Sequence, residues 1–287
     1  MTTTIPTQPT PSRSMRPDEL ERRLRARLDV LGQTFAELLI DCEEDRTLRA
    51  VLVGCCGRWR DSEMDRSDWL AERRAAVEAD YTRDGPTYDE GYDPTTPVHR
   101  KFVSRLIDTC PDGGMILDAA CGTGPYIGQV LDAGRRVIGT DQSTGMLAQA
   151  RSKYPETQFE LVGLQELAFD GEFDAVMCID AMEHVPPEDW PLVVRNLRRA
   201  VQPGGYGYLS LEEVDESELD RAFSEATAAG LPAIYGEDVG PDTGGYHFYA
   251  DRQRVRGWLA GAGYEVIDEA DEPLEGYGYH HLILRAV

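Results

Sequence analysis

Apolar residues from position 97 onward fall into two alternating patterns. Short apolar runs predict strands at 115–119, 137–140, 159–162, 175–179, 206–211, 264–268 and 280–284. Stretches with apolar residues three and four positions apart predict helices around 102–107, 126–133, 146–154, 190–200 and 252–262. Strands that alternate with helices are typical of an open α/β sheet with helices on both faces.

The first third of the chain has a different pattern. Residues 1–15 are polar and predict a disordered tail, and residues 16–96 predict a helical appendage. Apolar side chains recur from Leu20 to Leu38 at helical spacing, a second short helix is expected around 48–55, and a third from Asp68 to about Ala79. The stripe from Leu20 to Leu38 is narrow, which favours a helix that packs on one partner surface and predicts a homodimer.

Turn-forming residues and tyrosines fill the segment from Tyr81 to Pro97, which predicts a loop. This loop could be a linker packed on the body or a functional segment that closes over a ligand. Residues 97–287 form the expected main domain. Within it, residues 212–250 are too long for a simple connection and predict an inserted cap with a helix at 217–228. An insertion after a strand lies where open α/β sheets bind ligands.

Composition and charge restrict the partners of the protein. The 287 residues include 29 Lys and Arg against 52 Asp and Glu, which gives a net charge of −23. A surface this acidic argues against nucleic acid and anionic membranes as partners. No apolar run is long enough to span a membrane. The six cysteines form no CxxC pair, so the sequence predicts neither a zinc site nor a disulfide framework. This cysteine usage predicts a reducing, cytoplasmic setting.

The segment ILDAACGTGPY, residues 116–126, is the most informative part of the chain. Glycines at the end of a strand let the backbone approach a ligand closely. The next strand ends in Asp141, where a carboxylate can bind both hydroxyls of a ribose. Asp118, just before the glycines, would repel a pyrophosphate but suits a ligand that carries positive charge. These features indicate S-adenosylmethionine, with its amino and sulfonium groups, as cofactor.

Five segments in order resemble the class I S-adenosylmethionine-dependent methyltransferases: ILDAACGTG, IGTDQSTGML, GLQELAF, FDAVMCIDAMEHV and LRRAVQPGGYGYLSL. The resemblance covers about residues 97–287. It implies a Rossmann-like, doubly wound seven-stranded sheet with the last strand antiparallel, and a substrate site under a cap of N-terminal helices and insertion. Ala120 stands where the family more often has glycine, and Gly163 stands where it often has an acid against the adenine. The resemblance implies cofactor contacts from Asp118, Ala120, Cys121, Gly122, Gly124, Asp141, Gln142, Met146, Leu164, Gln165, Asp180 and Tyr92.

Candidates for the chemistry lie near the expected fourth and fifth strands. Methyl transfer needs alignment of the acceptor and, for a protonated nucleophile, a base. His184 and Glu183 follow the fourth strand, although they could simply cap the turn. Glu213, next to Glu212 at the end of the fifth strand, could face the substrate or belong to a solvated acidic run. His247 follows a Gly-Gly step in the insertion, which favours a place in the pocket over packing at a sheet edge.

The sequence therefore predicts an enzyme that transfers a methyl group to a small molecule, in the biosynthesis of a specialised metabolite. Two alternatives remain open on the sequence alone. The acceptor could be a protein or an RNA, and the fold could bind the cofactor without transferring its methyl group.

Overall fold

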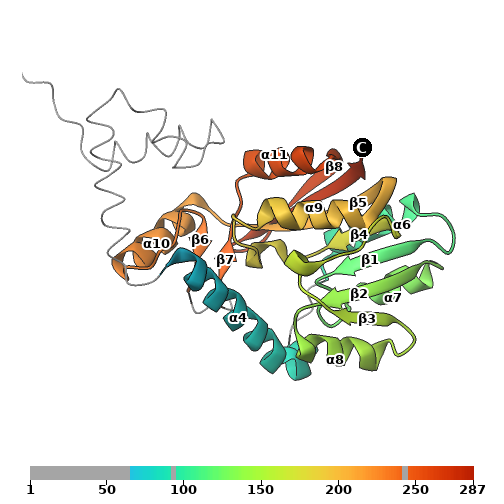
Figure 1. Cartoon of the computed structure of the whole chain (residues 1–287), viewed down its shortest axis with the longest axis horizontal. Helices are drawn as coiled ribbons and strands as arrows, with labels where there is room; N and C mark the ends of the chain where they lie inside the picture. The colour runs from blue at the N-terminus through green and yellow to red at the C-terminus, as the bar shows by residue number, and fades with distance from the viewer. Residues whose placement is uncertain (1–64, 92–94, 241–244) are drawn as a thin grey trace, which may run out of the picture. The chain divides into compact units, whose positions relative to one another are not determined.

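The computed structural model describes residues 65–91, 95–240 and 245–287 (Figure 1). The expected tail, the two helices expected before residue 56 and Tyr92 lie outside these residues. The predictions made for them are therefore unchanged by the structure.

One seven-stranded sheet forms the body of the described residues (Figure 1). Its strands are β1 (Met115–Ala119), β2 (Arg136–Asp141), β3 (Gln158–Leu161), β4 (Phe173–Cys178), β5 (Val201–Glu213), β8 (Tyr264–Pro273) and β9 (Gly278–Ala286). They are ordered β3-β2-β1-β4-β5-β9-β8, and β9 runs antiparallel to both of its neighbours while the pairs from β3 to β5 are parallel. All seven predicted strands and the antiparallel last strand are confirmed.

Helices cover both faces of this sheet. The helices of the main domain are α6 (Pro97–Thr109), α7 (Ile127–Asp132), α8 (Thr144–Lys153), α9 (Trp190–Ala200) and α11 (Arg252–Ala262). Alternate strand residues separate two cores: Leu117 packs with Trp190 of α9 and Leu259 of α11, whereas Ile116 packs with Phe102 of α6 and Val130 of α7. Successive side chains of β1 point to opposite faces of the sheet, so this one strand contributes to both cores. No helix among the described residues could cross a membrane.

The segment before the main domain is more helical than the sequence suggests. Helix α4 (Arg66–Asp84) continues past Tyr81 and is followed by the 3₁₀ turn η1 (Gly85–Thr87) and the short helix α5 (Tyr88–Gly91). The loop expected from Tyr81 is therefore wrong over residues 81–91. Asp65 caps α4, since its side chain accepts the Ser67 N–H at 2.8 Å. Packing against α8 holds the last turn, which the turn-forming composition alone would not predict.

The insertion after β5 contains the predicted helix, α10 (Glu216–Ala228), and the two-stranded sheet of β6 (Glu237–Asp238) and β7 (His247–Phe248). Arg66 at the start of α4 joins this insertion. Its guanidinium lies 2.7 Å from the fully buried Glu237 carboxylate and 2.6 Å from Glu188. Figure 1 shows α4 extending from beside α10 and β6 to α8.

Candidate active site

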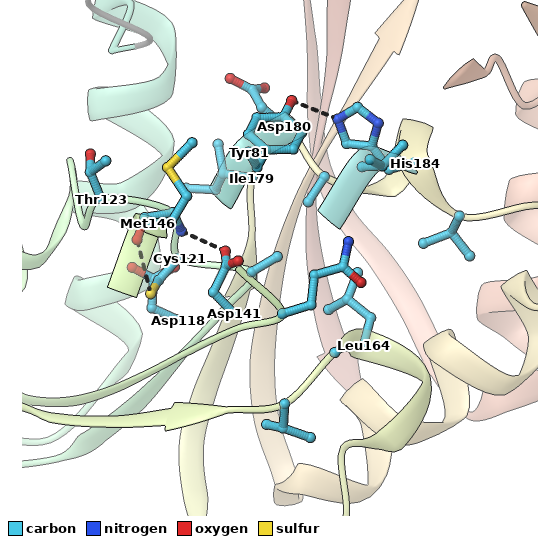
Figure 2. Close-up of a pocket in the computed structure, with 18 of the residues that line it drawn as sticks. Tyr81, Asp118, Cys121, Thr123, Asp141, Met146, Leu164, Ile179, Asp180 and His184 are labelled. Atoms are coloured by element: carbon cyan, nitrogen blue, oxygen red, sulfur yellow. Dashed lines mark hydrogen bonds between the residues drawn. The ribbon is translucent and has the colours of Figure 1, made fainter. Parts of the chain in front are cut away.

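A hollow opens at the carboxyl ends of β1, β2 and β4, beneath α4 (Figure 2). The short 3₁₀ turns η2 (Leu164–Glu166) and η3 (Met182–His184) also contribute to it. Its lining comes from five places along the chain: Arg74, Val77, Tyr81 and Tyr88; Asp118, Ala120, Cys121, Gly122, Thr123, Pro125 and Tyr126; Asp141, Gln142 and Met146; Val162, Gly163, Leu164 and Gln165; and Ile179, Asp180, Ala181, His184 and Val185.

The glycine loop after β1 has the left-handed backbone that its sequence suggests. Gly122 has φ +53°, and a Cβ at this position would meet no atom of the described residues within 4 Å, so the space above the backbone is free for a ligand. Gly124 has φ +77° and does not line the hollow; a Cβ there would lie 2.9 Å from Ile127. Ala120 is one of two described non-glycine residues with positive φ, at 58°. Its side chain strains a position that glycine fits more readily.

Asp141 ends β2 and is held in place by backbone groups. Its Oδ1 accepts the N–H of Ser143 at 2.7 Å, and its Oδ2 accepts the N–H of Gly122 at 2.9 Å. Burial raises the pKa of this carboxyl, while these N–H donors lower it. Each oxygen of an ionised carboxylate can accept more than one hydrogen bond, so both remain able to bind hydroxyl groups.

Asp118 has an unsatisfied carboxyl oxygen in the floor of the hollow. The side chain is only 2% exposed, and Oδ2 has no hydrogen-bond partner among the residues that the structure describes. Burial, with a smaller contribution from nearby Asp141, raises its pKa to about 8. A buried carboxyl without a partner is costly unless a ligand supplies a donor or positive charge. The amino and sulfonium groups of S-adenosylmethionine would do so, and the residues present therefore fit this cofactor.

Gly163, where the resembled family often has an acid, is restricted by its surroundings. A Cβ at this position would lie 2.8 Å from the Arg74 guanidinium and 2.8 Å from the Glu166 carboxylate. These two side chains form an ion pair from α4 to η2. Arg74 thus brings α4 against the part of the hollow lined by Leu164 and Gln165.

The backbone of helix α4 is in direct contact with the backbone at the start of α8. A Cβ on Gly145 would overlap the carbonyl oxygen of Thr82, and a Cβ on Gly85 would lie only 2.5 Å from the Gly145 backbone. The Thr82 and Ser143 hydroxyls are 3.1 Å apart at the same crossing. Gly85 of η1 and Gly145 of α8 therefore allow the end of α4 to pack directly against the start of α8, which follows β2.

His184 lines the hollow with both ring nitrogens engaged. Its Nδ1 lies 3.1 Å from the Tyr246 carbonyl oxygen, which can only accept, so Nδ1 carries the proton. Its Nε2 lies 2.8 Å from the Tyr81 hydroxyl and accepts from it, as the dashed line in Figure 2 marks. Burial lowers the pKa of His184 to about 4, so the ring is neutral near pH 7.

Three further predicted residues pack behind His184. The His247 ring lies 4.7 Å from the His184 ring between centroids, and its Nδ1 is 3.5 Å from the Glu212 carboxylate. Burial lowers the pKa of His247 to about 3 and raises that of Glu212 to about 7. Glu183 is 5% exposed, and its Oε2 has no partner within the described part of the chain. Burial and the Glu212 and Asp180 charges raise the pKa of Glu183 well above its ordinary value.

Glu213 points away from this cluster. Its carboxylate pairs with the Arg252 guanidinium at 2.5 Å and lines a second hollow, between the end of β5 and the β8–β9 hairpin. The successive residues Glu212 and Glu213 thus face opposite sides of β5, as the alternation of a strand predicts.

The structure brings together most of the predicted cofactor residues. Asp118, Ala120, Cys121, Gly122, Asp141, Gln142, Met146, Leu164, Gln165 and Asp180 line the hollow, together with His184. Glu183, Glu213, His247 and Gly124 do not line it. Sequence reasoning missed Arg74, Val77 and Tyr81 of α4. The tyrosines of the 81–97 segment were the available signal, and Tyr88 does line the hollow.

Comparisons with known proteins agree with this geometry. A family described as "Methyltransferase domain" matches residues 116–205. A ubiquinone biosynthesis O-methyltransferase of Xanthomonas axonopodis pv. citri is 28% identical over 216 residues, which cover 72% of this chain and 82% of that protein.

Two solved structures share the fold. Magnesium protoporphyrin IX methyltransferase from Synechocystis PCC 6803 with bound SAH has a TM-score of 0.57 at 18% identity, covering 75% of this chain and 100% of that one. Burkholderia thailandensis 1,6-didemethyltoxoflavin-N1-methyltransferase, with 1,6-didemethyltoxoflavin and S-adenosylhomocysteine bound, has a TM-score of 0.58 at 16% identity, covering 79% and 93%.

The fold, the glycine loop with Asp141, and these matches define a class I methyltransferase. Residues 116–205 match the methyltransferase-domain family, and the lining of the hollow fits S-adenosylmethionine as the cofactor of this methyltransferase.

Proposed function

We propose that this enzyme transfers the methyl group of S-adenosylmethionine to a hydroxyl oxygen of a small molecule, in the biosynthesis of a specialised metabolite. One observation carries the proposal. A single hollow holds both the cofactor residues Asp118 and Asp141 and, farther along it, the polar groups of Tyr81, Asp180 and His184. An acceptor bound at those groups lies beside a cofactor bound at the glycine loop.

The surroundings of this hollow and the charge of the protein support a small acceptor rather than a macromolecule. Helix α4 covers it and is fastened to α8 and to the insertion, which suits an enclosed small ligand better than a folded macromolecule. The net charge of −23 argues against RNA. The ubiquinone relative is an O-methyltransferase by name, which supports oxygen as the acceptor atom.

Each part of the hollow has a distinct task in the proposed reaction. Asp118, Gly122 and Asp141 hold the cofactor, which when bound supplies a methyl group on a positively charged sulfur. The Tyr81 hydroxyl donates to His184, so its oxygen remains able to accept a hydrogen bond from the acceptor hydroxyl. His184 orients Tyr81, because its own Nε2 is already engaged. Helix α4 excludes water and fixes the acceptor in line with the methyl group.

The test uses the purified full chain and S-adenosylmethionine with a trideuterated methyl group. The chain is incubated with an extract of the producing cells, separated into small-molecule and macromolecular fractions, and labelled products are found by mass spectrometry. We expect label in the small-molecule fraction, abolished by prior acetylation of its hydroxyls and by the Asp141→Ala variant. Label in protein or RNA, or cofactor binding without any label, would overturn the proposal.

We further propose that residues 16–96 complete the acceptor site and join two copies of the chain. The position of α4 supports the first part, and the apolar stripe of residues 20–38 supports the second. Light scattering on the full chain should give twice the 32.0 kDa of one copy, and a chain that lacks residues 1–45 should give the single mass. A dimer that survives this truncation would contradict the role of the stripe.

A further inference from the structure

The short helix α5 is joined to the glycine loop through Asp89. The Oδ1 atom of Asp89 accepts the Thr123 hydroxyl at 2.7 Å, and its Oδ2 atom accepts from the Lys153 ammonium group at 2.9 Å. Thr123 stands between the two glycines of the loop and lines the hollow, whereas Lys153 ends α8. One carboxylate of α5 thus connects the segment after β1 with the helix after β2.

The two contacts of Asp89 differ in their exposure to solvent. Thr123 is 1% exposed, so loss of the carboxylate would leave a buried hydroxyl without its acceptor. The ion pair with Lys153 joins side chains that are 35% and 44% exposed, so dissolved salt weakens it. Partial burial raises the pKa of Asp89, but the hydrogen bonds from Thr123 and Lys153 outweigh it and lower this pKa below its ordinary value. The carboxylate is therefore ionised at neutral pH.

The segment that leads into α5 is held at a second place near the cofactor residues. The Thr82 hydroxyl lies 3.1 Å from the Ser143 hydroxyl, in the turn between β2 and α8. Tyr88 lines the hollow, with its ring centroid 6.1 Å from that of Tyr81. The residues from Tyr81 to Asp89 therefore bridge two segments that carry predicted cofactor residues, one after β1 and the other after β2.

A helix of four residues cannot determine its own position. It makes too few backbone hydrogen bonds to be stable alone, so the side-chain contacts of α5 decide where it lies. Tyr88 directly precedes Asp89 in this helix. When Asp89 holds the glycine loop, Tyr88 is therefore kept in the lining of the hollow.

We propose that Asp89 is a positioning residue for the cofactor. Its contacts with Thr123 and Lys153 keep residues 81–91 closed over the glycine loop. Both contacts open when S-adenosylmethionine enters and when its product, S-adenosylhomocysteine, leaves. This inference rests on the cofactor and not on the acceptor, so its test is separate from that of the proposed function.

A contact that is made only in the closed form changes the rate of release more than the rate of binding. Its loss destabilises the closed complex, whereas the encounter of the cofactor with the open form is unaffected. Removing the charge of Asp89 should therefore raise the dissociation rate constant of S-adenosylmethionine about tenfold, the usual effect of one hydrogen bond to a charged group. The association rate constant should change less than about threefold.

The first test needs no acceptor. The full chain is loaded with tritiated S-adenosylmethionine, excess unlabelled cofactor is added, and the label that stays bound is followed by rapid filtration. Asp89→Asn should release the label about tenfold faster than the unmodified protein. Asp84→Asn is the matched control, because it removes the same charge from the same segment, and Asp84 pairs with Arg83 at 2.9 Å instead. Equal release from the two variants would overturn the proposal.

The second test separates this contact from a general loss of structure. If both residues act through one contact, the double variant of Asp89→Asn and Thr123→Val should release the cofactor no faster than Asp89→Asn alone. Raising the salt concentration should speed release from the unmodified protein more than from Asp89→Asn, because only the former has an exposed ion pair to screen. Multiplied effects in the double variant, or the same salt response in both proteins, would overturn the proposal.

Discussion

The Tyr81 hydroxyl donates to Nε2 of His184 at 2.8 Å, across 103 positions of sequence. This contact joins the helix that covers the hollow to the turn that follows β4. It also fixes the direction of the tyrosine hydroxyl, because the Tyr246 carbonyl leaves His184 only one nitrogen that can accept.

Tyr81→Phe should lower kcat/KM for the acceptor about tenfold, since one oriented hydrogen bond is worth about 1.4 kcal/mol. The affinity for S-adenosylmethionine should stay unchanged, as measured by calorimetry. Tyr235→Phe, which removes a hydroxyl bonded at 3.0 Å to the exposed Asp220, is the control and should retain full activity. Equal activity of the two variants would exclude Tyr81 from the acceptor contact.

Asp118→Asn should stabilise the ligand-free protein above pH 8 and weaken cofactor binding. The pKa of this carboxyl is raised to about 8 in the folded state from 3.8, so ionisation costs folding free energy as pH rises between these values. A tenfold change in the acid dissociation constant on folding corresponds to about 1.4 kcal/mol, and the Asn variant avoids this cost.

Urea denaturation at pH 4, 6 and 8 measures this effect. The gain in unfolding free energy of Asp118→Asn over the unmodified protein should be smallest at pH 4 and largest at pH 8. The affinity of the variant for S-adenosylmethionine should be reduced about tenfold at pH 8. A stability difference independent of pH would show that Asp118 is not the titrating group.

Gly145→Ala should displace α4, because its Cβ would overlap the Thr82 carbonyl oxygen. We expect a loss of about 1–3 kcal/mol in unfolding free energy and a weaker binding of the acceptor. Gly257→Ala in α11 is the matched control, since its Cβ meets no atom of the described residues within 4 Å. The control should gain about 0.5–1 kcal/mol from helix propensity. Equal urea midpoints for the two variants would contradict the close crossing of α4 and α8.

Ala120→Gly should raise the unfolding free energy by up to about 1 kcal/mol, because glycine adopts φ near 58° without strain. Ala133→Gly is the opposite control. Ala133 has φ −81°, so a glycine there relieves no backbone strain. The variant should lose about 0.5–1 kcal/mol of unfolding free energy, because glycine raises the entropy of the unfolded chain. Differential scanning calorimetry of both variants measures the two changes, and a loss in both would mean that Ala120 is not strained.

Most of the sheet was predictable because β1, β2, β4, β5 and β9 bury one or both faces and therefore carry continuous or alternating apolar runs. The glycine loop and Asp141 were predictable because their positions at strand ends restrict both backbone and chemistry. Their neighbours Gln142 and Leu164 came with the resemblance to a known family rather than from any pattern of their own.

The part of the site contributed by α4 was not predictable from local sequence. Arg74 and Tyr81 lie on a largely polar helix that is fixed by contacts with residues more than 60 positions away, namely Ser143, Glu166 and His184. Nor could sequence show that Glu183 and His247 pack behind His184 instead of lining the hollow. Two histidines and two acids near strand ends suggest chemistry, but only the packing decides which of them faces open space.

Helix α4 is anchored at Arg66 to the insertion and at Gly85 to α8, and it brings Arg74, Val77 and Tyr81 to a hollow whose floor belongs to the sheet. The lining of the hollow therefore comes from separate stretches of sequence, one in α4 and the others at the ends of the sheet strands. Substitutions at Arg74, Val77 and Tyr81 of α4 can therefore change the lining of the hollow while the glycine loop and Asp141 stay as they are.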